Sequence, residues 1–541
     1  MAHKVKNEPI YFLGIVIIAI YLRIQGLSRG LPFILNPEEV DFISSYLHLI
    51  GNFITSPYLP LTDLYVFISS IFATICAKAL NLHSIVKIIE LDPAVILFPF
   101  RVVAFLASIG SVVCVYFITR RFNSFVALGS TAIFALSLTH LAYSATVEPG
   151  TISLFFILLS LLFLLNAYKD SNPKLVDLSL LVSFIALNIH PLGIVSMLPI
   201  IFVISIFKRK KQPIFGFKKI LFFLMLFILL NPLFTFHIPY HLYLLGRYVF
   251  DSQNSLLYLG FLLKSIVVSF GFIGAILLAF LPFALKEHEL KKEAGIIFIF
   301  PVFYLLLLNL LHLTKQVHLL MLLPYVAIAI GFVFGMLCIK FKDLEQKWQQ
   351  ITATVVLFLL FWMPLKGALT YNKLIKLPDT RIVATQWINK KVNEHFVVTW
   401  DRNSVQLSYL DALDKNKLGK ARKAIHPKRK QIRRRFIAGS KLLKEKNWFR
   451  ILKKKTDYVV VNSIDIEKAF RSNRLNRSKG NNFKKKYYKE LLKEKPIAVF
   501  NPYYQGLENK TRYLWLEDLY MPFNTLFKRE RFGPVIKIYE L

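Results

Sequence analysis

The chain has 541 residues, of which 55% are hydrophobic, and its 68 Lys and Arg against 32 Asp and Glu give a formal net charge of +36. The mean hydropathy of +0.50 and the repeated long apolar runs exclude an ordinary soluble protein and indicate an integral membrane protein. The three cysteines, Cys76, Cys114 and Cys338, lie in apolar stretches without metal-ligand spacing. This pattern argues against a disulfide framework and against a zinc site.

The first apolar segment covers residues 10–27. It is too long for the hydrophobic region of a typical signal peptide and lacks a small-residue cleavage site, so we expect it to be the first membrane span. A long loop, residues 28–98, follows, and its apolar piece 64–80 is interrupted by Lys78. We expect interfacial helices in this loop, with a full span as the alternative.

The loop begins with an acidic segment, GLPFILNPEEVDF at residues 30–42, which contains the carboxylates Glu38, Glu39 and Asp41. Asn36 and the proline after it are typical of a helix start, and Glu39 three residues on completes a capping box. Capping accounts for Glu39. It does not account for Glu38, which lies about 100° further round a helix. Glu38 is therefore either a boundary charge or a proton-transfer group in a water-filled pocket at the membrane surface.

Ten further apolar segments are long enough to be membrane spans. They cover about residues 100–119, 123–141, 150–167, 175–189, 192–207, 219–236, 259–283, 294–312, 318–339 and 351–369. Lys and Arg cluster in alternate loops, which predicts that these loops and the N-terminus are cytoplasmic. With eleven spans, everything after about residue 370 is then extracytoplasmic.

Residues 371–541 have a soluble composition and form a predicted second domain after the transmembrane domain, residues 1–370. The second domain holds about 41 of the 68 Lys and Arg against about 16 acids. Its pattern is α/β. The expected elements are a helix near 380–393 and strands at 396–400, 457–462 and 534–539. The charge favours anionic lipid head groups or acidic glycans as partners, with a solvated basic face as the alternative. An extracytoplasmic position disfavours nucleic acid.

Polar residues at the predicted outer ends of the spans are further site candidates. Glu148 is at a helix start, where the helix dipole favours a carboxylate, and acids near a bilayer tend to mark sites. Arg101 is on the outer side, so it either reaches lipid phosphate, binds a leaving phosphate or orients the acids of the first loop. Lys315 and His318 are a second candidate for phosphate contact. His190 fits a simple turn on the same side.

A metal site is not expected. His237 and His241 have i,i+4 spacing, but Pro239 between them disfavours a regular helix and no third ligand is evident. Phosphate loops, dinucleotide fingerprints and hydrolase motifs are also missing from any suitable context in the sequence.

Several short motifs occur in an order shared with a known family. They are Asn36-Pro37-Glu38-Glu39, Arg101, Arg120-Arg121, Tyr143-Ser144 through Glu148-Pro149, Asp379 to Ile388, Asp457 to Val461 and Gly533 to Tyr539. In this order the chain resembles the GT-C fold membrane glycosyltransferases, specifically the protein O-mannosyltransferase and lipid A aminoarabinose transferase superfamily. Two departures stand out: glutamates replace the aspartates of the family's first-loop motif, and Val317-His318 replaces an Arg-Tyr pair.

The resemblance implies a GT-C-like polytopic α-helical protein with about eleven transmembrane helices, interfacial helices in the catalytic outer loop 28–98 and a C-terminal extracytoplasmic α/β domain. It implies transfer of a hexosyl or pentosyl group from a polyprenyl-phosphate donor to a protein, lipid or glycan at the outer face of the plasma (inner) membrane. Glu38 and Glu148 are then the catalytic residues. The expected substrate and phosphate contacts are Arg101, Lys315, His318, Glu39 and His190. No cofactor is firmly implied, although a divalent cation would be compatible.

Two other classes of function are open at this stage. A transporter or flippase of an anionic lipid-linked substrate would predict internal repeats and charges near mid-membrane, whereas the charges here cluster at one face. A membrane-anchored binding protein would explain the basic tail but not the paired acids.

Overall fold

A computed structural model describes residues 7–33, 94–209, 216–232, 255–282, 291–310, 316–340, 346–392, 396–401, 456–471, 479–505 and 523–541, with short pieces between 35 and 75 and a few single residues elsewhere. It consists of two compact units. The helical unit comprises Met1–Leu27, Phe53–Ala73 and Phe98–Asn372, and the sheet unit comprises Ser28–Asn52, Thr74–Leu97 and Lys373–Leu541. The sheet unit therefore includes parts of the first loop as well as the C-terminal region.

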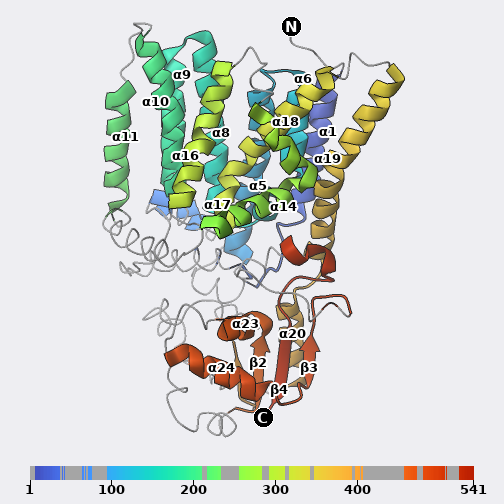
Figure 1. The fold of residues 1–541 in the computed structure, drawn as a ribbon. Helices are drawn as coiled ribbons and strands as arrows, with labels where there is room; N and C mark the ends of the chain where they lie inside the picture. Colours follow the sequence, from blue (N-terminus) through green and yellow to red (C-terminus); the bar gives the residue numbers. More distant parts are fainter. Residues whose placement is uncertain are drawn as a thin grey trace. The chain divides into compact units, whose positions relative to one another are not determined.

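Helices account for most of the described chain (Figure 1). In chain order up to the sheet they are α1 (Glu8–Ile24), α5 (Ala94–Thr119), α6 (Ser124–Ala135), α7 (Leu138–Tyr143), α8 (Pro149–Asp170), α9 (Pro173–Ile189), η1 (Pro191–Ser196), α10 (Met197–Arg209), α11 (Gly216–Leu230), α14 (Ser255–Ala279), α16 (Lys291–Leu310), α17 (Gln316–Leu319), η2 (Leu320–Leu322), α18 (Leu323–Lys340) and α19 (Gln346–Ile375). Each predicted span overlaps at least one of these helices.

Polar contacts at opposite ends of α1 and α5 show that these two helices are antiparallel. At one end, the Glu8 carboxylate accepts hydrogen bonds from the Tyr116 hydroxyl (2.7 Å) and the Ser124 hydroxyl (2.9 Å). At the other end, the Arg101 guanidinium donates to the Leu27 carbonyl (2.9 Å). We refer to these as the Glu8 end and the Arg101 end of the helical unit.

Glycine permits a close approach between α6 and α18. A Cβ built on Gly331 would lie 2.5 Å from the Ser130 backbone nitrogen, and one on Gly335 would lie 3.0 Å from that of Val126. These pairs run in opposite directions along the two helices, so α18 is antiparallel to α6. Small residues at helix interfaces allow such close backbone packing in membrane proteins.

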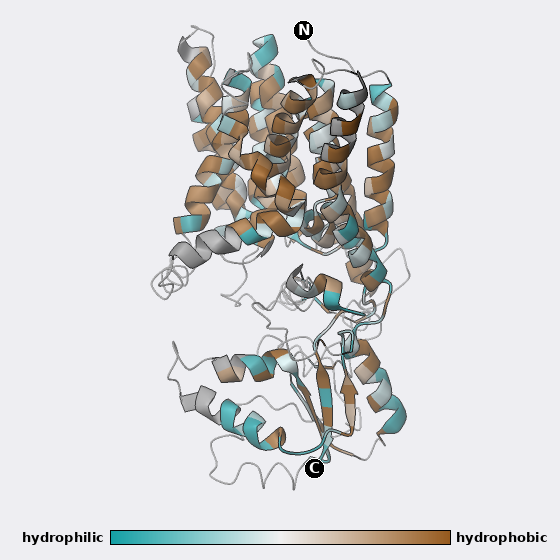
Figure 2. Cartoon of the chain, turned by 45° about the vertical axis from the view of Figure 1, so that its right-hand side comes forward, coloured by the Kyte–Doolittle hydropathy of each residue, from teal (hydrophilic) through white to brown (hydrophobic). Residues whose placement is uncertain are grey.

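Four helices in the described part of the chain are long and apolar enough to cross a membrane: Ala94–Thr119, Pro149–Asp170, Lys292–Leu310 and Val317–Ile339. The helical unit is mostly hydrophobic along its helices (Figure 2). Together these features identify a multi-pass membrane protein. The predicted total of eleven spans stays a prediction. The described residues between Leu64 and Ile75 are helical, and the choice between interfacial helices and a full span there also stays open.

The sheet unit contains a small mixed sheet with strand order β1-β2-β4-β3. Its elements are α20 (Thr380–Lys391), β1 (Val398–Trp400), β2 (Tyr458–Asn462), α23 (Ser463–Arg471), α24 (Lys479–Leu491), β3 (Ala498–Phe500), η8 (Phe523–Lys528) and β4 (Ile536–Glu540). Strand β1 is parallel to β2, whereas β4 is antiparallel to both β2 and β3. The sequence pattern predicts α20, β1, β2 and β4 but not β3.

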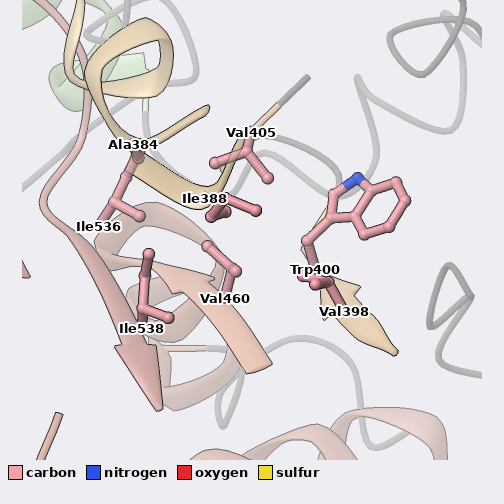
Figure 3. Close-up of a cluster of buried hydrophobic side chains, with 8 residues drawn as sticks. All are labelled: Ala384, Ile388, Val398, Trp400, Val405, Val460, Ile536 and Ile538. Carbon is pink, nitrogen blue, oxygen red and sulfur yellow. The ribbon is translucent and has the colours of Figure 1, made fainter. Parts of the chain in front are cut away.

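Alternation along β2 gives the sheet two buried faces. Val460 belongs to a cluster with residues of α20, β1 and β4, which Figure 3 shows. Val459 and Val461 belong to the opposite cluster, together with Tyr487 and Leu491 of α24. Both faces of the strand are therefore covered by helices, and its valines are fully buried.

We predict that Gly331→Ala weakens the helical unit. The added methyl group would overlap backbone atoms of Ser130, which cannot rotate away, so the overpacking should lower the free energy of unfolding by about 1–3 kcal/mol. The measurement is thermal unfolding of the purified protein in detergent. Gly295→Ala is the matched control, because nothing lies within 4 Å of its added carbon. Equal midpoints for the two variants would contradict the close packing.

Candidate active site

Four of the residues singled out in the sequence lie at the same end of the helical unit. Arg101 defines this end through its hydrogen bond to Leu27. Helix α8, which begins after Glu148, lies against η2: a Cβ on Gly150 would be 3.6 Å from Leu320. Helix α6 begins at the Glu8 end with Ser124, and α18 is antiparallel to it. The start of α18, which η2 directly precedes, therefore lies away from the Glu8 end. The topology therefore brings Arg101, Glu148, His190 and His318 to one end of the helical unit. Figure 1 shows the arrangement of the helices that carry them.

Glu148 is the N-cap of α8. Its backbone is extended (φ −118°, ψ 111°), its side-chain Oε1 accepts a hydrogen bond from the Gly150 N–H (3.1 Å), and Pro149 occupies the first helical position. The carboxylate is buried at 4% exposure. A cap needs only one oxygen, and a neutral side chain would serve. The contact with Gly150 accounts for one of the two carboxylate oxygens of Glu148.

His190 and His318 are held by backbone contacts at this end. The His190 ring Nδ1 accepts a hydrogen bond from the Leu192 N–H (3.3 Å) and so caps η1. The sequence predicts a turn at His190 and Pro191, and η1 continues into the start of the predicted span 192–207. The hydroxyl of Ser153 in α8 donates to the Ala186 carbonyl in α9 (3.0 Å), which brings the end of α9 beside the start of α8. The Tyr304 hydroxyl donates to the His318 carbonyl (2.9 Å) and links α16 to α17.

The acidic segment of the first loop belongs to the sheet unit. Glu39 is helical and fully buried, and so is Phe42, which agrees with a helix start after Asn36. Glu38 and Lys315 lie outside the described residues, as do His237 and His241. The roles assigned to these residues therefore stay predictions.

A buried ion pair holds the acidic segment at Leu35, ahead of its carboxylates. Arg381 donates from Nε and Nη2 to the two carboxylate oxygens of Asp379 (2.9 and 2.8 Å) and from Nη1 to the Leu35 carbonyl (3.0 Å). Both side chains are 4% exposed. The sequence contains the Asp-Thr-Arg motif but offers no sign that its arginine contacts a residue 346 positions earlier.

The charge state of Asp379 follows from these contacts. Burial alone would raise the pKa of this carboxyl, but the charge and hydrogen bonds of Arg381, with the charge of Arg29, outweigh burial and hold the pKa below its usual value. Asp379 also caps α20 by accepting from the Arg381 backbone N–H (2.9 Å). The pair is therefore ionised at neutral pH and anchored to the start of α20.

Arg23 is a buried polar residue that the sequence reading did not single out. Its guanidinium, 1% exposed, contacts the Ser108 hydroxyl (2.8 Å), the Ala19 carbonyl (3.1 Å) and the His140 Nδ1 (3.0 Å). A charge inside the apolar segment 10–27 was the available signal, because arginine is costly there unless it faces polar groups inside the bundle. It lies one helical turn before Leu27, towards the Arg101 end.

No group of three or more His, Cys, Asp or Glu side chains in the described part of the chain is arranged to hold a metal ion.

Comparisons with known proteins bear on the family. Residues 94–238 match the family model described as dolichyl-phosphate-mannose-protein mannosyltransferase. No curated protein matches the chain.

The fold is similar to three solved structures of two enzymes. One is the oligosaccharyltransferase of Archaeoglobus fulgidus in the apo form, with a TM-score of 0.49, 11% identity and coverage of 85% of this chain and 70% of that chain. The second is the same enzyme, AglB, in complex with an inhibitory peptide and a dolichol-phosphate. It has a TM-score of 0.45, 12% identity and coverage of 84% of this chain and 69% of that chain. The third is ArnT from Cupriavidus metallidurans bound to undecaprenyl phosphate, with a TM-score of 0.45, 11% identity and coverage of 86% and 94%. The family match confirms the resemblance seen in the motifs: over residues 94–238 the chain is similar to the dolichyl-phosphate-mannose-protein mannosyltransferases.

Proposed function

We propose that this protein is an integral membrane glycosyltransferase that moves a hexosyl or pentosyl group from a polyprenyl-phosphate donor to a protein, lipid or glycan acceptor. One observation carries the proposal. The segment that matches the mannosyltransferase family, residues 94–238, contains Arg101, Glu148 and His190, and these residues lie at the same end of the helical unit. A lipid-linked sugar presents its phosphate at a membrane surface, where cations and carboxylates at helix ends can contact it.

The basic residues support an extracytoplasmic position for the Arg101 end. Arg120 at the end of α5, Lys169 at the end of α8 and Lys340 at the end of α18 all belong to the Glu8 end. An excess of Lys and Arg marks the cytoplasmic side of a membrane protein. We therefore propose that the reaction takes place at the outer face of the plasma (inner) membrane, with the C-terminal region on the same side.

In the proposed reaction an acceptor oxygen attacks the anomeric carbon of the donor sugar. The bond between that carbon and the phosphate oxygen breaks, the configuration inverts, and the polyprenyl phosphate leaves with the bonding electron pair. The acceptor proton passes to a carboxylate, for which we propose Glu38. We propose Glu148 as the residue that positions the acceptor, since it is a buried carboxylate at the Arg101 end of the helical unit.

The leaving phosphate gains negative charge as the bond breaks, and cationic donors stabilise it. Arg101 and Lys315 are the proposed donors, with His318, Glu39 and His190 as further substrate contacts. Burial of Arg101 at 3% exposure strengthens its electrostatic effect relative to water. The apolar helices would accommodate the polyprenyl chain. The alternative is a transporter or flippase of an anionic lipid-linked substrate.

We expect Glu38→Gln to slow turnover of the donor strongly. Removing a general base should lower kcat by about 10²–10⁴-fold, because the amide cannot accept the acceptor proton. The measurement uses the purified full-length protein in liposomes with labelled polyprenyl-phosphate hexoses and pentoses and follows release of the sugar. Glu8→Gln is the matched control, because Glu8 is a buried glutamate at the opposite end that contacts Tyr116 and Ser124.

Unchanged turnover in Glu38→Gln would show that another group is the base. If wild-type protein consumes no donor but moves labelled lipid between leaflets, the transporter replaces the enzyme.

Two substitutions at Glu148 distinguish its role in capping α8 from the proposed role of its carboxylate in turnover. Glu148→Gln keeps an oxygen for the Gly150 N–H, so thermal unfolding should change little, while turnover should fall because the carboxylate is lost. Glu148→Ala loses both, and its free energy of unfolding should drop by about 1 kcal/mol. Full activity in Glu148→Gln would reduce Glu148 to a structural cap.

A further inference from the structure

We propose that Arg381, held by Asp379, is a positioning residue for the acidic segment of the first loop. Residues that follow α19 would then help to position the segment that carries Glu38 and Glu39, by fixing the Leu35 carbonyl within the sheet unit. The inference rests on the proposed function, because it assigns these contacts to the same reaction. Asp379 and Arg381 would then support the reaction without touching the substrate.

The Arg381 guanidinium joins the two segments with defined geometry. Two of its N–H groups form a fork with the Asp379 carboxylate, and a third donates to the Leu35 carbonyl. Because the guanidinium is planar, the fork to Asp379 sets the direction of the third donor. The position of the Leu35 carbonyl is thus fixed relative to the start of α20.

A second contact holds the same loop a few residues earlier. The Arg29 guanidinium lies over the Phe532 ring, with its central carbon 4.1 Å from the ring centroid. A cation over an aromatic face is attracted by the ring electrons. Residues 29 and 35 of the first loop are therefore both tied to the C-terminal region.

Hydrogen bonds to residues 532 and 534 hold the chain at Thr380, between Asp379 and Arg381. The Thr380 hydroxyl donates to the Pro534 carbonyl (2.7 Å), and the Thr380 N–H donates to the Phe532 carbonyl (3.0 Å). Between these residues, Gly533 has φ +102°, and a Cβ there would overlap Thr380 and Asp379. Only glycine adopts this conformation readily. Residues 379–381 and 532–534 thus form a buried junction with Leu35, and the half-buried Arg29 contacts its edge at Phe532.

Chain length links the junction to the proposed base. Glu38 lies three positions after Leu35, so the two backbone positions can be at most about 11 Å apart. Buried ion pairs are seldom needed for stability alone, since apolar side chains of similar size are often as stable. Two buried charges that hold the acidic segment at Leu35 are therefore best explained by positioning.

The test uses the full-length protein in nanodiscs and two variants. Arg381→Lys keeps the positive charge but cannot bind Asp379 through two parallel bonds while reaching Leu35. The double variant Asp379→Asn with Arg381→Gln removes both charges and leaves no unpaired ion. We expect faster hydrogen exchange in peptides covering residues 28–42. We also expect kcat to fall by about 10- to 100-fold, the effect of slight misplacement of a reacting group, with KM for the donor unchanged.

Val461→Ala is the control for general weakening of the sheet unit, because Val461 is fully buried on the other side of the sheet. It should leave exchange at 28–42 and kcat as in the wild type. Unchanged exchange in both Arg381 variants overturns the proposal, as does faster exchange without loss of kcat, or an equal effect of Val461→Ala. If the wild type shows no transfer, the proposed function fails, while the exchange data still decide whether Arg381 holds the loop.

Discussion

The cost of placing charge in an apolar medium determines where this protein can have polar chemistry. Along the helices of the helical unit the side chains are mostly apolar, and the backbone groups are satisfied within each helix. Charged residues therefore gather where helices begin and end. Glu8 and Arg120 form an ion pair at one end (3.2 Å), while Arg101 and Glu148 lie at the other. The two ends therefore differ. The Glu8 end is basic, with Glu8 paired to Arg120, and the Arg101 end carries the candidate site.

Arg23 and His140 lie in the interior of the helical unit and not at a helix end. The cost of burying charge is met there by contacts with other polar groups. Arg23 lies inside α1, yet its guanidinium contacts Ser108, His140 and a backbone carbonyl instead of lipid. The His140 ring stacks on Phe134, with centroids 4.2 Å apart, and is fully buried. Polar groups in the interior thus meet other polar groups from α1, α5 and α7. This network links three helices near the end that carries the candidate site.

Local pattern was enough to predict most of the helices. Apolar runs of sufficient length gave their positions, and caps such as Glu148 followed by proline gave their starts. Local pattern did not predict the break between α6 and α7, within the segment 123–141, because both halves are equally apolar. It also missed β3, which is three residues long and depends on pairing with β4.

In the candidate site too, some residues could be predicted from local sequence and others could not. Arg101 and Glu148 were accessible to sequence reasoning because each is a charge that the positive-inside bias or a simple boundary does not fully explain. The role of Arg381 was not accessible, because its partner Leu35 offers only a backbone carbonyl, a group that every residue has. Contacts of this kind leave no side-chain signature at one of their two positions. They appear only when the fold brings the two segments together.

The position of β4 in the sheet extends this argument to folding. Strand β4 lies between β2 and β3, so the sheet lacks an inner strand until residues 536–540 are in place. Residues 532–534, which fix Thr380 and carry the ring beneath Arg29, directly precede that strand. The contact of Arg29 with Phe532 therefore forms only after about 500 further residues have been synthesised, and the contact of Leu35 with Arg381 spans 346 positions. Long-range contacts of this kind form late, because the entropy of closing a long loop opposes them. A first loop that is completed last links formation of the proposed catalytic segment to correct folding of the whole sheet unit.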